Sequence, residues 1–198
     1  MIPRKRLVVL ISGFGSNLQA ILDASRAETL LADVAAVFSD RSAAFGLTRA
    51  RDVGIPAIHR PFSPFEGLPE ARRAYDAALA DRVADYDPDL IVLAGWMRVL
   101  SCAFLDRFPG RVINLHPALP GCFPGAHAIE RAFEAAQAGL IDCTGVTVHF
   151  AVEALDAGPV VASRRVPILP SDTLSSLKAR VQVAERATLV PAIASLLG

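Results

Sequence analysis

An asparagine and a histidine stand two positions apart where an apolar run ends. Asn114 and His116 close the run that begins at residue 111. Residues i and i+2 of a strand point to the same face, so the two side chains are expected to project together. Pro117 cannot continue the hydrogen-bonding ladder, and it restricts His116 to an extended conformation. An amide donor beside a histidine suits the oxyanion that develops during acyl transfer, so the pair is a candidate catalytic site.

A carboxylate would make such a histidine more useful, because it would keep the imidazole charged or ready to shuttle a proton. The candidate is Asp156, which lies in the turn sequence LDAGP after another predicted strand. A simpler interpretation stays open for each residue alone: Asn114 and Asp156 as turn formers, and His116 as a half-exposed surface group. Spacing by itself does not name the reaction.

A glycine-rich loop, SGFGSN at residues 12–17, joins the first apolar run to a helix-like segment. Glycines let the backbone approach an anion, and the free amides of a helix start can bind a phosphate. A dinucleotide-binding fingerprint with Asp40 as the ribose-binding acid is the competing interpretation, but Leu18 occupies the place of its third glycine. A tight turn without any ligand also stays open. The loop favours a single phosphate, with these candidate ligands: Gly13, Gly15, Ser16 and Asn17.

The cysteines and the remaining histidines indicate no metal site. Cys102, Cys122 and Cys143 are odd in number and form no closely spaced pair, so neither a disulfide framework nor a zinc ribbon is expected. His127 and His149 do not form a spaced metal pair with any acid. His149 lies inside an alternating run, where a structural and a functional role are equally open.

Strand-like and helix-like segments that could position these residues alternate along the chain. The predicted strands cover residues 7–11, 34–38, 56–58, 90–95, 111–115, 146–152 and 160–168. The predicted helices cover residues 17–27, 43–53, 69–85, 128–138 and 173–197. This alternation predicts a single α/β domain over residues 1–198, with a mostly parallel twisted sheet between two helical layers. The last two strands are expected to form an antiparallel addition.

Such a sheet binds its ligands beyond the carboxyl ends of the strands, near the point where the strand order reverses. The candidate residues all follow strands, so they are expected to meet at that edge. With 20 basic and 20 acidic residues the chain has no charge pattern for nucleic acid or an anionic membrane. The apolar run LVVLI is too short for an export signal or a membrane span, and a cytoplasmic protein is expected.

Several stretches, taken together and in order, resemble the phosphoribosylglycinamide formyltransferase family. They are LVVLISGFGSN, AVFSDRSAAFGLTRA, DLIVLAGWMR, NLHPALP with FPGAHA, and GVTVHF followed by LDAGPV. The resemblance runs from about Leu7 to Pro191. It implies transfer of the formyl group of 10-formyltetrahydrofolate to the amine of glycinamide ribonucleotide in purine biosynthesis, with no metal.

The resemblance also implies roles for individual residues. Asn114, His116 and Asp156 match the catalytic trio of the family, and the glycine loop matches its phosphate cradle. Glu185 corresponds to an acid near the substrate amine. The residues implied in folate binding, besides Asn114, are Arg72, Met97, Arg98 and Leu100.

Two departures from the family fall beside the catalytic trio. Residues 118–123 read ALPGCF, where the family usually has Ser-Leu-Leu-Pro-Lys-Tyr, so the conformation of this loop is open. Ala157 replaces a usual glycine, which makes a positive φ at that position less comfortable.

Other functions remain possible at this level. A formyltetrahydrofolate hydrolase shares the NxHP and LDxGP core. Methionyl-tRNA formylation is less expected, because a chain with no net charge lacks the basic surface that binds tRNA. A nicotinamide-dependent oxidoreductase or a non-catalytic binding module are the alternatives from other classes. Monomer and dimer are equally open.

Overall fold

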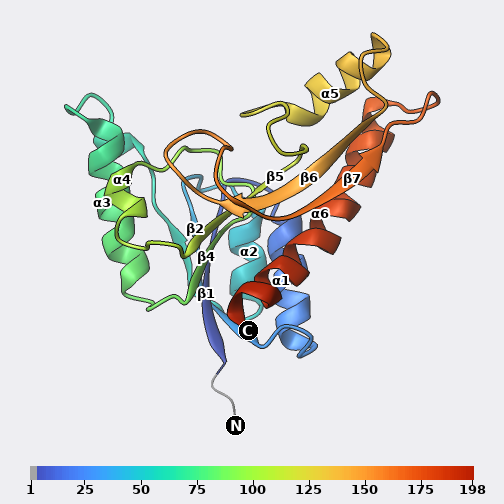
Figure 1. The fold of residues 1–198 in the computed structure, drawn as a ribbon. Helices are drawn as coiled ribbons and strands as arrows, with labels where there is room; N and C mark the ends of the chain where they lie inside the picture. Colours follow the sequence, from blue (N-terminus) through green and yellow to red (C-terminus); the bar gives the residue numbers. More distant parts are fainter. Residues whose placement is uncertain (1–3) are drawn as a thin grey trace.

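The computed structural model describes residues 4–198. Its centre is a seven-stranded sheet with the strand order β3-β2-β1-β4-β5-β6-β7 (Figure 1). The strands are β1 (Lys5–Ile11), β2 (Ala32–Ser39), β3 (Ala57–His59), β4 (Leu90–Leu93), β5 (Val112–His116), β6 (Cys143–Phe150) and β7 (Val160–Pro167). Strands β1 to β5 pair in parallel, whereas β6 and β7 pair antiparallel. The predicted mostly parallel sheet with an antiparallel addition is confirmed.

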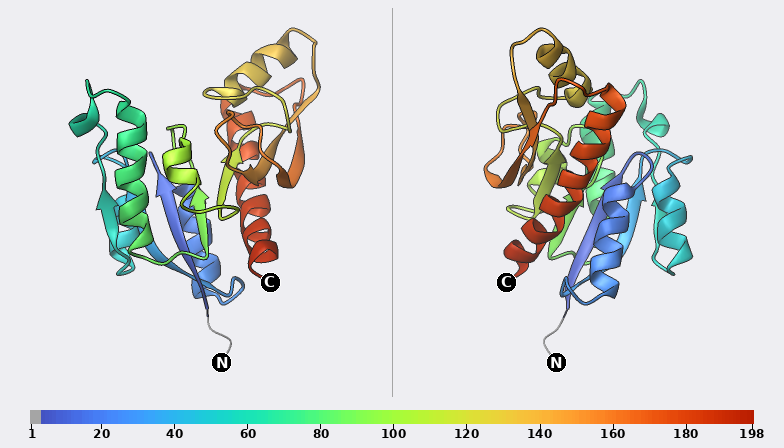
Figure 2. Two further views of the ribbon diagram at one scale, coloured as in Figure 1. Left: turned by 60° about the vertical axis from the view of Figure 1, so that its left-hand side comes forward. Right: turned by 90° about the vertical axis from the view of Figure 1, so that its right-hand side faces the viewer.

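Helices cover both faces of the sheet (Figure 2). They are α1 (Ser16–Arg26), α2 (Phe45–Asp52), α3 (Ala71–Ala84), α4 (Cys102–Leu105), α5 (Ala128–Gln137) and α6 (Leu174–Leu197). The sequence analysis did not predict the short helix α4 or the 3-10 turn Ser63–Phe65, because one turn of helix carries no measurable periodicity. No helix of residues 4–198 is long and apolar enough to cross a membrane.

Alternating side chains of β1 divide the core into two layers. Leu7 and Val9 pack with residues of α1, α2 and α6 on one face. Val8 and Leu10 pack with α3 and α4 on the other. Burial on both faces explains why this strand is an unbroken apolar run rather than an alternating one. A third cluster joins α5 and the first half of α6 to strands β6 and β7.

Helix α6 continues through Pro191, and the carbonyl group that loses its helical partner there is contacted from β7. Proline has no N–H to give to the carbonyl four residues earlier, at Ala187. Arg164 on β7 donates to this carbonyl at 3.5 Å and to the Thr188 hydroxyl at 3.2 Å. The antiparallel extension is thereby tied to the helix that also carries Glu185.

The strand order reverses at β1, which lies between β2 and β4. The segments that follow β1, β4 and β5 therefore leave the sheet at one edge. A ligand crevice is expected there in a sheet of this type.

Candidate functional site

A cavity of about 850 Å³ opens at this edge of the sheet. The glycine loop lines one end of it, with Gly13, Gly15, Ser16, Asn17 and Glu185. Asn114, His116 and Asp156 line the other end. Residues implied in folate binding, Met97, Arg98 and Leu100, lie in the wall that follows β4. The residues singled out in the sequence thus share one cavity, with one exception.

The exception is Arg72, which does not line the cavity. It lies on α3 with about half of its side chain exposed, and its Nε is 3.8 Å from a carboxylate oxygen of Asp76. Arg98 does line the cavity, but its guanidinium lies 3.8 Å from the centre of the Phe62 ring and 3.9 Å from Asp40. The structure therefore brings Arg98, and not Arg72, to the cavity.

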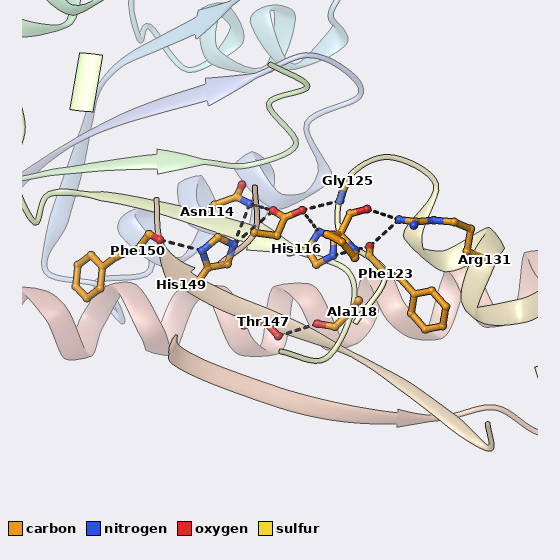
Figure 3. A network of polar contacts seen from close by, with 11 residues as sticks. Asn114, His116, Ala118, Phe123, Gly125, Arg131, Thr147, His149 and Phe150 are labelled. Carbon is orange, nitrogen blue, oxygen red and sulfur yellow. Dashed lines mark hydrogen bonds and ion pairs between the residues drawn. The ribbon is translucent and has the colours of Figure 1, made fainter. Parts of the chain in front are cut away.

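The three candidate catalytic residues are in contact. Asn114 Nδ2 donates to Asp156 Oδ1 at 3.1 Å, and His116 Nδ1 lies 3.4 Å from Asp156 Oδ2. The side chains of Asn114 and His116 lie close together at the end of β5 (Figure 3). The side chains of His116 and Asp156 are only 8% and 9% exposed, so water screens their mutual attraction weakly.

Asp156 is held in an unusual backbone conformation. Its φ is 51°, in the left-handed region that few residues other than glycine, asparagine and aspartate adopt. The sequence predicts a sensitive φ at Ala157, but in the structure the positive φ falls on Asp156 itself. Strained backbone conformations are common among active-site residues, where the surrounding contacts hold the residue in place.

The charge of Asp156 is stabilised despite its burial. Burial alone would raise the pKa of the carboxyl group, but His149 at 3.6 Å, the Gly125 N–H at 2.7 Å and the nearby His116 outweigh it. The net effect lowers the pKa below its usual value of 3.8. Asp156 is therefore an anion at neutral pH.

His149 belongs to the same cluster, which the sequence left open. It pairs with Asn114 across β5 and β6. Its Nδ1 lies 2.9 Å from the Phe150 carbonyl oxygen, and its Nε2 lies 3.2 Å from Asn114 Nδ2 and 3.6 Å from Asp156. The alternation of β6 showed that His149 faces one side of the sheet, but not that this side is the site.

Two influences act on the charge of His149. Burial lowers the pKa of the ring, while the Asp156 carboxylate and the Phe150 carbonyl raise it, with a net upward shift. The amide nitrogen of Asn114 can only donate, so its contact with Nε2 is a hydrogen bond only when the ring is neutral. The neutral ring, with its hydrogen on Nδ1, satisfies both of these contacts.

Both hydrogens of the Asn114 amide are consequently in use, one toward Asp156 and one toward His149. An oxyanion stabilised by this amide must replace one of these contacts. The 3.2 Å contact with His149 is the weaker one, because its acceptor is uncharged.

The glycine loop at the other end is shaped by its main chain. Gly15 has φ 77°, and a Cβ atom there would lie 2.7 Å from Gly46 Cα, so only glycine fits. The Gly13 carbonyl accepts from Gly46 N–H at 3.2 Å, and the Phe14 carbonyl accepts from Arg49 Nε at 3.0 Å. Helix α2 thus binds carbonyl groups of the loop. These oxygens point toward α2 and away from the side on which an anion would bind.

Glu185 of α6 lies next to the first turn of α1. Asn17 Nδ2 donates to Glu185 Oε2 at 3.2 Å, while the buried Asn17 Oδ1 has no partner among the described residues. Burial raises the pKa of Glu185, and the Asn17 hydrogen bond opposes this only in part. A buried carboxyl group and an unpaired carbonyl oxygen form a site for a hydrogen-bond donor.

Asp40, the residue required by the dinucleotide-binding alternative, is engaged within the protein. Ser12 Oγ donates to its carboxylate at 2.6 Å, and Ser12 in turn accepts from Met97 N–H at 3.0 Å. Since its side chain is only 7% exposed, Asp40 fastens the loop after β4 to β1 and β2 rather than presenting a carboxylate to a ribose.

A parallel sheet with this antiparallel extension and an Asn-His-Asp cluster at its edge is the arrangement expected of a folate-dependent formyltransferase. The chain belongs to the formyl transferase family, since the model of that family matches residues 5–193. It is 46% identical over 195 residues to phosphoribosylglycinamide formyltransferase of Schizosaccharomyces pombe, covering 94% of each protein. The identity to the enzyme of the same name in Escherichia coli is 43% over 181 residues, covering 91% of this chain and 82% of that protein.

Solved structures agree with these relatives. Glycinamide ribonucleotide transformylase 1 from Symbiobacterium toebii superposes with a TM-score of 0.89 at 40% identity, covering 98% of this chain and 88% of that chain. Phosphoribosylglycinamide formyltransferase from Bacillus halodurans superposes with a TM-score of 0.90 at 32% identity, covering 98% and 96%. The predicted resemblance and fold are confirmed.

Proposed function

We propose that this chain transfers the formyl group of 10-formyltetrahydrofolate to the amine of glycinamide ribonucleotide, in purine biosynthesis. The products are formylglycinamide ribonucleotide and tetrahydrofolate. The observation that carries the proposal is the contact of Asn114, His116 and Asp156 at one end of a cavity whose other end is a glycine loop. One end suits formyl chemistry and the other suits a phosphate, as this pair of substrates requires.

The ribonucleotide is proposed to bind along the cavity, with its phosphate at residues 13–17. The main-chain amides of Gly15 to Asn17 and the start of α1 supply donors for the anion. Asn17 Oδ1 and Glu185 are the acceptors nearest to that loop, and we assign them to donors of the glycinamide part. Fixing the phosphate makes the attack of the amine effectively intramolecular.

The folate is proposed to occupy the wall formed after β4. Met97 and Leu100 offer apolar contacts there, and Arg98 lies on the same strip. Arg72 stays a proposed folate contact through the resemblance alone, since its side chain reaches Asp76 in this arrangement.

In the proposed reaction the substrate amine attacks the formyl carbon and a new carbon–nitrogen bond forms. The carbonyl oxygen becomes an oxyanion, which takes a hydrogen bond from the Asn114 amide and is stabilised by the positive charge of the His116 imidazolium. Asp156 stabilises the charged imidazole and accepts or relays the proton that leaves the amine. When that proton reaches N10 of the folate, the old carbon–nitrogen bond breaks and tetrahydrofolate leaves. No step requires a metal.

We place the reaction in the cytoplasm, because the three cysteines are free among the described residues. Formal net charge is zero, which supports small-molecule substrates rather than nucleic acid or a membrane surface.

The proposal is tested by mixing purified protein with both substrates and following tetrahydrofolate release. Formylated ribonucleotide should appear in equal amount, and omission of the ribonucleotide should stop the reaction. Formate release without an amine acceptor would instead identify a hydrolase. Binding of both ligands without turnover would identify a non-catalytic module. A saturable fluorescence change with reduced nicotinamide cofactor would favour the oxidoreductase alternative.

A further inference from the structure

Two residues of the loop between β5 and α5 contact the catalytic side chains, Phe123 at His116 and Gly125 at Asp156. The Phe123 carbonyl oxygen lies 3.1 Å from His116 Nε2, and the Gly125 N–H donates to Asp156 Oδ2 at 2.7 Å (Figure 3). A carbonyl oxygen only accepts, so Nε2 must carry a hydrogen for the first contact to be a hydrogen bond. The proton that can be exchanged on His116 is then the one on Nδ1, the nitrogen beside Asp156.

Phe123 does not hold its conformation by local preference. Phe123 has φ 47° and Gly125 has φ 80°, both in the left-handed region. For a residue with a side chain this conformation costs about 1–2 kcal/mol, so Phe123 needs contacts that offset it. The start of the loop is fixed separately, because Thr147 Oγ1 donates to the Ala118 carbonyl at 2.7 Å.

Arg131 of α5 supplies the contacts at the other end of the loop. Its Nη2 donates to the Phe123 carbonyl at 2.7 Å and to the Pro124 carbonyl at 2.5 Å. Its guanidinium carbon lies 5.9 Å from the centre of the Phe123 ring. Phe123 also packs against the apolar cluster that contains Ala132, the next residue of α5. One arginine therefore binds two successive carbonyls of the segment that touches the catalytic groups.

We propose that Arg131 is a positioning residue for the formyl-transfer site. It holds the Phe123 carbonyl so that the proton of His116 stays on Nε2 and Nδ1 faces Asp156. Because the carbonyl oxygen has two lone pairs, it can accept from Arg131 and His116 together. The same anchored segment presents the Gly125 N–H to Asp156. Arg131 itself touches neither of the two catalytic side chains among the contacts described. The inference rests on the proposed roles of His116 and Asp156.

The same contacts restrain the end of residues 118–123, the loop that departs from the family pattern. A cation from the following helix binds its last carbonyl, that of Phe123.

The test compares Arg131→Gln and Arg131→Lys with the unmodified protein. Arg82→Gln is the matched control, since Arg82 is an exposed helical arginine that pairs only with Asp85 among the described residues. We expect Arg131→Gln to lower kcat by about 10-fold to 100-fold, the usual cost of a misplaced catalytic group, with both KM values within about twofold. Arg131→Lys keeps a charged donor and should recover part of kcat.

Imidazole ¹⁵N spectra give a readout that is independent of turnover. In the unmodified protein the His116 signals should show hydrogen on Nε2. In Arg131→Gln they should show a mixture of tautomers, and Arg82→Gln should leave them unchanged.

Three outcomes would overturn the proposal. These are an unchanged kcat, an unchanged His116 tautomer in Arg131→Gln, or a parallel loss of folding and of both KM values in Arg131→Gln and Arg131→Lys. If the unmodified protein fails to formylate the ribonucleotide, the proposed function is wrong, and the spectra still decide whether Arg131 orients His116.

Discussion

The two ends of the cavity are built in different ways. The proposed phosphate end is built from the main chain of consecutive residues, 13–17, and helix α2 binds the carbonyls of Gly13 and Phe14 from behind. At the formyl-transfer end, side chains come from β5, from β6 and from the turn around Asp156, with main-chain groups of a fourth segment between them. A backbone site depends on local conformation, whereas a side-chain cluster depends on how distant segments are aligned. Changes at the first end should act mainly on binding, and changes at the second on turnover.

The pKa values of the carboxyl groups at the two ends are shifted in opposite directions. Burial raises the pKa of Glu185, because the hydrogen bond from Asn17 offsets the effect of burial only in part. Hydrogen bonds and the two histidines dominate at Asp156 and lower its pKa. The phosphate end therefore keeps a carboxyl group that is easily neutralised, and the formyl-transfer end keeps an anion.

The largest effect is expected from Asp156→Asn or His116→Ala. Either change removes a charged partner from the transition state, so kcat should fall by about 10²-fold to 10⁴-fold. The KM for the ribonucleotide should change little, because the phosphate end is untouched. Initial rates of tetrahydrofolate release over a range of both substrates measure this.

Asp106→Asn is the matched control, since Asp106 is exposed and away from the cavity. An Asp156→Asn protein with full kcat would contradict the assignment of turnover to the end of the cavity that contains Asp156.

Gly15→Ala should give the clearest effect at the phosphate end. Its φ of 77° costs a side chain about 1–2 kcal/mol, and the added Cβ would lie 2.7 Å from Gly46 Cα. Since 1.4 kcal/mol is tenfold, the KM for the ribonucleotide should rise about 10-fold while the KM for folate stays the same. Steady-state kinetics with each substrate varied in turn test this.

Gly54→Ala separates the two causes. Gly54 has φ 75° but no atom within 4 Å of its added Cβ, so this variant should lose stability without a change in either KM. A rise in the folate KM of Gly15→Ala equal to that for the ribonucleotide would contradict a local phosphate site.

Arg49→Gln should give a smaller effect of the same kind. The Arg49 guanidinium lies 4.5 Å from the Phe14 ring centre and 4.8 Å from that of Phe45, and its Nε binds the Phe14 carbonyl. Loss of about 1 kcal/mol should loosen the loop and raise the ribonucleotide KM about 3-fold to 10-fold. Arg51→Gln, an exposed change on the same helix, should leave the KM unaltered. An equal effect of both variants would show that helix charge, rather than the loop, is responsible.

The smallest effects are expected in the pH dependence of stability. The pKa of Asp156 is lowered from 3.8, so its stabilising contribution is present above pH 3.8 and is lost as pH falls through the lower value of the folded state. The pKa of Glu185 is raised from 4.5, so its contribution is present below pH 4.5 and is lost as pH rises through the higher folded value.

Denaturant unfolding of two variants across pH 3 to 8 separates these signs. Asp156→Asn should be less stable than the unmodified protein at pH 7, and the difference should shrink in acid. Glu185→Gln should be more stable at pH 7, and that difference should also shrink in acid. If both variants changed the stability in the same direction at pH 7, the pKa values of the two carboxyl groups would not be shifted in opposite directions.

Much of the fold could be predicted because its signals are local. Unbroken apolar runs such as residues 7–11 indicated strands buried on both faces, and the alternating run that contains His149 indicated a different kind of strand. Helix α4 and the turn Ser63–Phe65 are too short to show periodicity, and they were missed.

The candidate site was predicted only in part, for a related reason. Asn114 and His116 share a face by strand geometry, and the glycine loop is a continuous motif. His149 joins them through the antiparallel register that pairs it with Asn114. Arg131 joins through the return of α5 toward the loop, and Arg72 stays outside because its helix turns it toward Asp76. None of these placements follows from spacing along the chain.

The class of fold, the placement of Asn114 and His116 on one face, and the turn of the glycine loop follow from local patterns in the sequence. These depend on side-chain alternation and on residues a few positions apart. Three features depend instead on the folded chain: the face on which His149 lies, the left-handed conformation of Asp156, and the contact of Arg131 with the loop beside His116. Those features are contacts between segments far apart in the chain, and their energies depend on strand register and helix placement, which no local pattern encodes.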